Sequence, residues 1–150
     1  MAKWLSVDEQ KSWRSIIAAW TRIDNQLNKD LQSEHGLTMA DYEILVRLSE
    51  VGGRRMRMSE LAETTLASRS RLSHQIGRME AAGLVARAEC TEDRRGSFAV
   101  LTDAGWQALV TAAPDHVASV RKYLVDVLTQ AEFKALGESC LKVAESLEDT

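Results

Sequence analysis

Residues 58–101 constrain the fold of this chain more than any other stretch. A short amphipathic segment covers 59–65, and a longer one follows after a break and covers 68–82. Two short apolar runs come next, at 84–86 and 98–101, and their length and spacing are typical of the two strands of a hairpin. The order of these segments predicts two helices joined by a turn and followed by a β-hairpin.

Two different faces are predicted for the longer of these helices. Leu72, Ile76 and Met79 recur at helical spacing, so they are expected to form its buried stripe. The opposite side carries short side chains or side chains with hydrogen-bonding tips, as an element that enters the major groove of DNA requires. The candidate DNA-contacting residues of this helix and of its start are Ser68, Arg69, Ser70, Arg71, Ser73, His74 and Arg78.

Charge is distributed unevenly along the chain, although its net charge is only −3. Residues 54–102 hold nine arginines and six acids, whereas the rest of the chain holds ten basic residues and sixteen acids. No acid occurs between Glu63 and Glu80, an interval that contains most of the longer helix. A merely solvated polar surface is the alternative interpretation, but an acid-free interval across most of a helix favours contact with nucleic acid.

The turn of the predicted hairpin carries two adjacent arginines. It reads Asp93, Arg94, Arg95 and Gly96, and a tip of this size can enter a minor groove, where narrow A·T-rich segments attract arginine. Asp93 is close enough in sequence to hold the Arg95 guanidinium in position, although a surface turn with a weak ion pair is the alternative. With the two helices, this hairpin predicts a winged helix-turn-helix, a fold that binds duplex DNA.

The ends of the predicted helices are marked by capping residues. Thr38 with Asp41 repeats the capping-box spacing of Ser6 with Glu9, and Ser59 can cap the helix that it precedes. Arginines crowd the connection before that helix, and we interpret them as a solvated linker in preference to a phosphate contact. These residues are Arg54, Arg55 and Arg57.

Long helices are predicted at about 6–35 and 102–148, on both sides of a head at about 38–101. Their apolar stripes are wider than so small a head can cover, so burial against a second copy of the chain is expected. Trp13 and Trp20 on the first helix could face that second chain or a small-molecule cavity, and packing within a core is the alternative.

A specific pattern lies at the predicted wing, where Asp93-x-Arg95 is followed, after five further residues, by Leu101-Thr102. Further positions of the same pattern are Leu61-Ala62, Ser68, Leu72, Ile76, Met79-Glu80 and Gly83-Leu84-Val85. In these motifs, and over nearly all of its length, the chain resembles the MarR (multiple-antibiotic-resistance regulator) family.

The resemblance implies a mainly α-helical fold with a small β-hairpin wing, as a single domain over 1–150 whose terminal helices form a homodimer. It implies sequence-specific binding to pseudo-palindromic duplex DNA, usually as a repressor, with Arg95 in the minor groove and Asp93 as its orienting partner. Many members release DNA when a small, often aromatic, acid binds between the dimer helices and the head. The residues that could line such a cavity here are Trp13, Trp20, Tyr42 and Arg47.

Other functions find less support in the residues. The histidines have no metal-ligand spacing, and no Gly-rich phosphate loop or nucleophile motif occurs, so neither an enzyme nor a bound cofactor or metal is expected. A winged module that binds protein is one alternative. A cysteine-based redox regulator is another, although packed thiols are the simpler interpretation of Cys90 and Cys140. No leader and no bilayer-spanning apolar run occur, which predicts a cytoplasmic protein.

Overall fold

The computed structural model describes residues 1–65, 68–89 and 96–148. The chain divides into two compact units. We call Asn28–Asp115 the head unit, and Met1–Leu27 with His116–Thr150 the helical unit. Two long helices, α1 (Val7–His35) and α5 (Asp103–Tyr123), contribute residues to both units.

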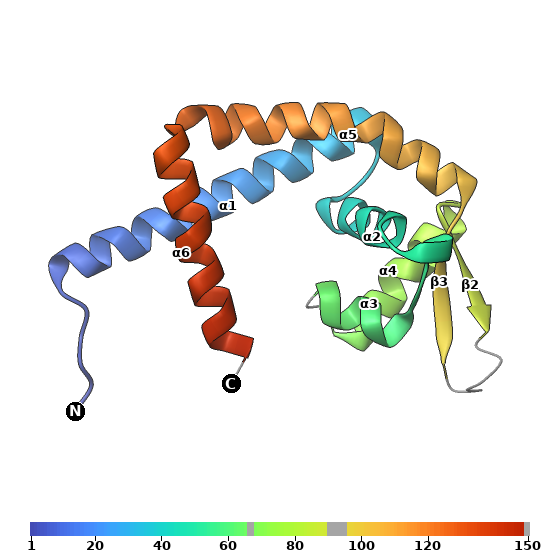
Figure 1. Ribbon diagram of the computed structural model, residues 1–150, viewed down its shortest axis with the longest axis horizontal. Coiled ribbons are helices and arrows are strands. Elements are labelled where there is room, and N and C mark those ends of the chain that lie inside the picture. The colour runs from blue at the N-terminus through green and yellow to red at the C-terminus, as the bar shows by residue number, and fades with distance from the viewer. Residues whose placement is uncertain (66–67, 90–95, 149–150) are drawn as a thin grey trace. The chain divides into compact units, whose positions relative to one another are not determined.

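The head unit is mainly helical and contains one small sheet, which confirms the predicted fold class. Three helices, α2, α3 and α4, lie together beside the β2–β3 hairpin (Figure 1). The elements of this unit between α1 and α5 are α2 (Met39–Ser49), the 3-10 turn η1 (Gly52–Arg54), β1 (Arg55–Arg57), α3 (Met58–Thr65), α4 (Arg69–Ala81), β2 (Val85–Glu89) and β3 (Ser97–Leu101).

The sheet has three antiparallel strands in the order β1-β3-β2. Val85 pairs with Leu101 and Met56 pairs with Ala99, and all four side chains are buried. Because side chains alternate along a strand, this register directs one face of the sheet into the core and leaves the other outside. The strand β1 was not predicted, since its residues were interpreted as part of a linker.

A single apolar cluster holds the helices of the head unit against this sheet. Its largest fully buried side chains come from α1, α2, α3, α4 and β2, and they are Leu31, Ile44, Leu45, Leu48, Leu61, Leu72, Ile76 and Val85. Full burial of one such side chain contributes about 1.5–3 kcal/mol relative to leaving it in water. The predicted stripe of the longer helix therefore lies in the core of one chain.

Local hydrogen bonds set most of the helix ends. Thr38 and Asp41 form the predicted capping box at the start of α2, because each backbone N–H donates to the other side chain at 3.0 Å. Ser6 and Glu9 form the same arrangement at the start of α1. The expectation for Ser59 was wrong, because α3 already begins at Met58 and places Ser59 inside its first turn.

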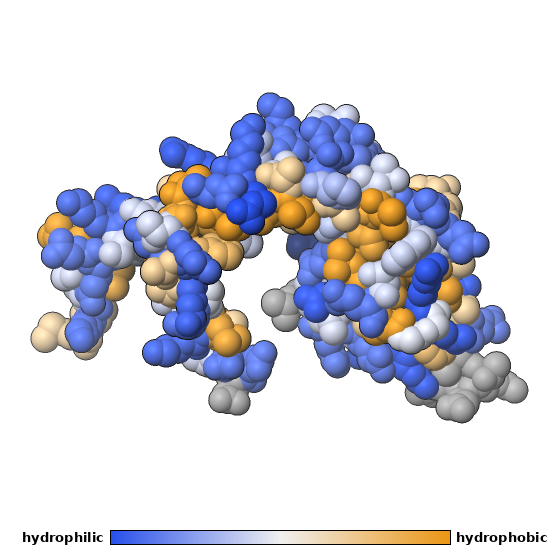
Figure 2. Space-filling view, turned by 45° about the horizontal axis from the view of Figure 1, so that its top comes forward, coloured by the Kyte–Doolittle hydropathy of each residue, from blue (hydrophilic) through white to orange (hydrophobic). Residues whose placement is uncertain are grey.

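The helical unit contains the first part of α1, the last part of α5, the 3-10 turn η2 (Val125–Val127) and α6 (Gln130–Glu148). Every residue of α6 is exposed. Figure 2 shows apolar surface on this helix. In the part of the chain that the structure describes, no helix combines the length and the apolar character needed to cross a membrane.

Candidate nucleic-acid interface

Helix α4 presents two chemically distinct sides, as predicted. The stripe of Leu72, Ile76 and Met79 is at most 2% exposed. Ser68 lies at the N-cap, where its hydroxyl accepts a hydrogen bond from the backbone N–H of Arg71 at 3.2 Å. Of the predicted contact residues, Ser73 is half-buried, and those that are exposed are Ser68, Arg69, Ser70, Arg71, His74 and Arg78.

Most of the exposed side chains on α4 surround one open hollow. This hollow measures about 610 Å³ and is lined by Ser68, Ser70, Arg71, His74 and Arg78. Within the described residues, Arg69, Arg71 and Arg78 have no salt-bridge partner. These guanidinium groups are therefore available to phosphates or to base edges, both of which arginine binds through paired hydrogen bonds.

A second cavity, of about 400 Å³, lies between α4 and the strands. It receives three arginines, with Arg57 from β1, Arg69 from α4 and Arg87 from β2. Its other described lining residues are Met58, Ser59, Leu72, Ser73, Gly96 and Ser97, so no acid of the described residues lines it. Three cations around one cavity suit an anionic group such as a backbone phosphate.

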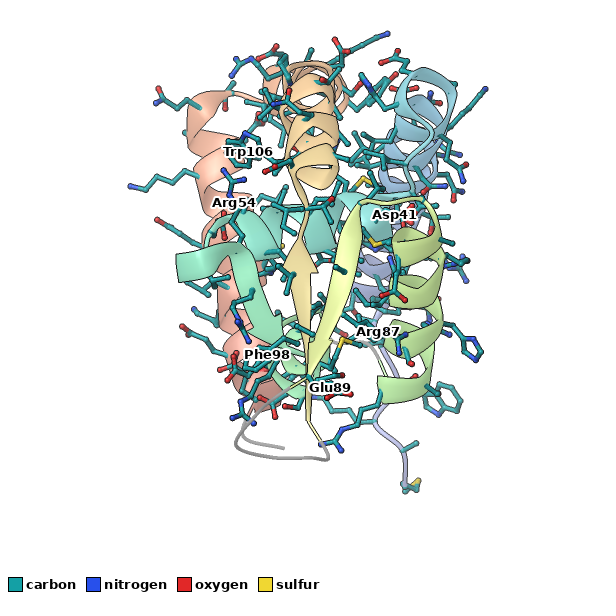
Figure 3. All side chains as sticks on the ribbon, turned by 90° about the vertical axis from the view of Figure 1, so that its right-hand side faces the viewer. Asp41, Arg54, Arg87, Glu89, Phe98 and Trp106 are labelled. Atoms are coloured by element: carbon teal, nitrogen blue, oxygen red, sulfur yellow. The ribbon has the colours of Figure 1, made fainter. Side chains whose placement is uncertain are left out.

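Arg87 joins the wing to α4. Its Nη2 donates a hydrogen bond of 2.8 Å to the backbone oxygen of Ser73, and its backbone N–H donates one of 3.0 Å to Oε2 of Glu80. Figure 3 shows the Arg87 side chain between β2 and α4. The contact fixes the base of the hairpin against the candidate recognition helix. Sequence reasoning missed Arg87, because no local pattern marks a strand residue that reaches a helix.

Gln75 is the buried polar residue of α4. It is 6% exposed, and its Nε2 donates to Oδ1 of Asp41 at 3.4 Å. Asp41 belongs to the capping box of α2, and Asn28 of α1 accepts a hydrogen bond of 2.9 Å from the backbone N–H of Met39 beside it. Polar contacts therefore connect α1, the start of α2 and α4. Sequence reasoning missed Gln75, although its spacing from the apolar residues of α4 places it on the buried side.

The three arginines before α3 do not form the solvated linker that was expected. The Arg54 Cζ lies 4.3 Å from the centre of the Trp106 ring, and its Nη1 lies 3.9 Å from Oδ1 of Asp103. Figure 3 shows Arg54 close to Trp106. Arg55 and Arg57 are residues of β1, and both extend over the ring of Phe98. Such cation–π contacts contribute about 0.5–1 kcal/mol each at exposed sites. The aromatic rings keep the guanidinium groups at the edge of the sheet.

The base of the wing explains part of the family signature. Leu101 is buried, and the Thr102 hydroxyl donates to the backbone oxygen of Gly83 at 2.6 Å. The same hydroxyl accepts a hydrogen bond of 3.0 Å from the backbone N–H of Gly105. Thr102 therefore connects the end of α4 to the start of α5. The predicted tip residues Asp93, Arg94 and Arg95, together with Cys90, lie outside the described residues.

The residues predicted to line a ligand cavity belong to two different units. Trp13 and Trp20 are exposed on α1 in the helical unit. Tyr42 and Arg47 are half-buried on α2 in the head unit, where burial raises the pKa of Tyr42 and Arg47 lies 3.7 Å from Glu43. A cavity shared by these four residues stays a prediction.

The cysteine that the structure describes, Cys140, is exposed on α6 and has a free thiol. It therefore does not have the packed environment expected for it.

Comparisons with known proteins agree with this geometry. The family model of the MarR family matches residues 35–96. The MarR family transcriptional regulator AbsC from Streptomyces coelicolor is 50% identical, with 99% of this chain and 100% of AbsC covered and a TM-score of 0.94. Sco3205, a MarR family transcriptional regulator from the same organism solved in complex with DNA, is 44% identical, with 98% and 92% covered and a TM-score of 0.95.

A curated relative extends the comparison beyond Streptomyces. The transcriptional repressor MdtR of Bacillus subtilis (strain 168) is 27% identical over 89% of this chain and 84% of its own length. The predicted absence of an enzyme is confirmed at the level of the family, whose members are transcriptional regulators. Identity of 50% over the full length, together with the winged-helix head, places this chain in the MarR family of transcriptional regulators.

Proposed function

We propose that this protein is a homodimeric repressor that binds a pseudo-palindromic DNA site and is released from it by a small aromatic acid. The observation that carries the proposal is the exposed, acid-free face of α4, with arginines that have no salt bridge among the described residues. In support, the related regulator Sco3205 was solved in complex with DNA, and the relative MdtR is a repressor.

The two cavities beside α4 suggest separate roles for their side chains. Arg71, His74 and Arg78 around the open hollow contact base edges in the major groove, because they are exposed on the side of α4 that lacks the buried stripe. Arg57 and Arg69 around the second cavity bind backbone phosphate, which positions the head without distinguishing sequences. Arg95, at the tip of the wing, remains the predicted minor-groove arginine.

Variants in the two cavities test this division. His74→Ala should cost about 1–3 kcal/mol at the preferred site and relax the sequence preference there. Arg57→Ala should weaken binding to all duplexes to a similar extent. It should also make the slope of the logarithm of the association constant against the logarithm of the salt concentration less steep by about one. The preferred site is identified by selecting bound duplexes from a random pool. The affinity of each variant for that site and for other duplexes is then measured by fluorescence anisotropy.

A matched control is Arg121→Ala, which removes an arginine of the helical unit that pairs with Asp126. It should leave sequence preference unchanged. If wild-type protein prefers no duplex sequence at low salt, the protein is not a sequence-specific regulator.

The homodimer is supported by the apolar side chains that the helical unit leaves in water. Trp20 is 68% exposed, Val143 60% and Leu147 67%. Monomeric proteins rarely leave a large apolar patch in water, so a second copy of the chain is the economical cover. Two heads in such a dimer would meet half-sites about 34–36 Å apart, one turn of the duplex.

Sedimentation equilibrium tests the dimer directly. Wild-type protein should sediment as a dimer, and Val143→Glu should shift the mass towards the monomer. The neighbouring Lys142→Glu also introduces an acid on α6 and should have a smaller effect. A monomeric wild type at the concentrations used for DNA binding would exclude the symmetric complex.

Release by a ligand is tested with the protein–DNA complex. A panel of aromatic carboxylic acids, with benzoate among them, is added while DNA binding is monitored. If the predicted cavity is correct, a compound that releases the DNA should lose its effect in Arg47→Ala, because the guanidinium would bind its carboxylate. Release that persists in both Arg47→Ala and Trp20→Ala would exclude these residues as the ligand site.

A further inference from the structure

Three potential metal ligands gather where α1 ends. His35 Nε2 lies 2.9 Å from Oδ2 of Asp115 on α5, and Glu34 is adjacent to His35 in the chain. One ligand atom from each of the three side chains lies within 4.8 Å of the other two. No other group of three such side chains was found in the described parts of the chain.

The charge around this cluster favours a cation. Glu34 and His35 lie in the last turn of α1, where the helix dipole places about −0.5 of an elementary charge and makes an acid unfavourable. Asp115 brings a second carboxylate to the same place. Among the described residues, Glu34 has no ion-pair or hydrogen-bond partner. Neither carboxylate pairs with a lysine or an arginine among the described residues, so the cluster carries negative charge that a bound cation would compensate.

The distances fit a shared ion after a small side-chain movement. Two ligand atoms bound to one zinc ion at 2.0–2.2 Å are about 2.8–3.6 Å apart. The 2.9 Å between His35 and Asp115 is already in this range. The His35 side chain is only 13% exposed and is held by its surroundings, whereas the exposed Glu34 side chain can rotate to complete the set.

We propose that Glu34, His35 and Asp115 form a binding site for a divalent transition-metal ion, with zinc as the best match. One imidazole and two carboxylates suit zinc and its neighbours, whereas magnesium and calcium prefer oxygen ligands alone. The ion would join the end of α1 to α5. This proposal replaces the sequence-based expectation of no metal, which could not detect ligands 80 positions apart.

Zinc binding to the full-length protein is measured by isothermal titration calorimetry in the absence of DNA, with magnesium titrated in parallel. One zinc ion per chain should bind, and magnesium should give no saturable signal. Zinc affinity should fall at least about tenfold in each of three variants, Glu34→Gln, His35→Ala and Asp115→Asn. The loss of a side chain that binds the metal directly should cost more than the loss of one that only hydrogen-bonds to a ligand. His74→Ala removes an exposed imidazole on α4 and should leave the affinity unchanged.

Cobalt(II) provides an independent measurement, because its visible absorption reports the ligands directly. The bands should appear on wild-type protein and be lost in His35→Ala. Glu34→Gln changes only an exposed side chain, so it keeps the test valid if His35→Ala does not fold. The proposal is overturned if folded wild-type protein binds no stoichiometric zinc, which would leave only an ion pair, or if Glu34→Gln and Asp115→Asn bind zinc as tightly as wild type.

Discussion

The head unit and the helical unit use the same kind of amphipathic helix in opposite ways. In the head unit, Leu48 and Ile76 are completely buried by other elements of the same chain. In the helical unit, Trp20 is 68% exposed and Leu147 is 67% exposed. The difference teaches that an apolar stripe identifies the helix face that becomes buried. It does not identify whether the same chain or a second molecule buries that face.

A matched leucine substitution should separate the two units most clearly. Leu48→Ala removes a fully buried side chain of α2 and should lower the free energy of unfolding by about 2–5 kcal/mol, since it also leaves a cavity. Leu141→Ala removes the same atoms from α6, where the side chain is 58% exposed. In a single chain this change should cost less than about 0.5 kcal/mol. Urea denaturation measures both values.

Protein concentration sharpens this test. The loss in Leu48→Ala should not vary with concentration, whereas any larger loss in Leu141→Ala should appear only where the chain associates. Equal losses at the lowest measurable concentration would contradict the contrast, because Leu141 would then be buried within one chain.

Two glycines give a second comparison between the units. A Cβ at Gly105 would lie 2.0 Å from the backbone oxygen of Leu84 and 2.7 Å from Cδ1 of Leu101. Gly105→Ala should therefore cost about 1–3 kcal/mol, as overpacked sites do. Thermal unfolding followed by circular dichroism measures this loss.

Gly137 on α6 is the control for this substitution. A Cβ there meets nothing within 4 Å, so Gly137→Ala should stabilise the helix by about 0.5–1 kcal/mol. The opposite signs are the expected result. A stabilising Gly105→Ala would mean that the contact between the start of α5 and Leu84 is looser than the structure has it.

Local signals in the sequence predicted many of the helix ends and the two sides of α4. Thr38 with Asp41, and Ser68, determine where helices begin through hydrogen bonds to residues three positions away, so the chain reveals them directly. The buried stripe of α4 is likewise a property of spacing alone. These features needed no knowledge of the tertiary structure.

Features created by distant pairing could not be predicted in this way. Strand β1 has only three residues, and it is a strand because Met56 pairs with Ala99. Arg87 acquires its role through a hydrogen bond to Ser73 on another element, and His35 meets Asp115 only after the chain folds. No periodicity or spacing encodes such contacts, which is why the structure adds residues to the candidate sites.

Removal of the polar contact between α4 and α2 should lower the stability of the head unit moderately. Gln75→Leu leaves Oδ1 of Asp41 without its amide donor and should cost about 1 kcal/mol. A double-mutant cycle with Asp41→Asn should give a coupling energy of about 0.5–1.5 kcal/mol, because the two side chains are in contact. Chemical denaturation of the four proteins measures it. A coupling energy of zero would mean that the 3.4 Å contact contributes no stability.

The smallest effect is expected from a helix cap in the helical unit. Hydrogen bonds from the backbone and then the hydroxyl of Thr129 lower the pKa of Glu132 below its usual value of 4.5. A carboxyl group with a lowered folded-state pKa contributes stability above its unfolded pKa and loses it as the pH falls through the folded value. The melting temperature should therefore fall slightly more for wild type than for Glu132→Gln between about pH 6 and about pH 3. Glu145→Gln is the control, because it removes an exposed acid with no ion pair among the described residues, and it should retain the wild-type pH dependence. If the melting temperature of all three proteins falls equally with pH, this cap adds nothing to the stability of α6.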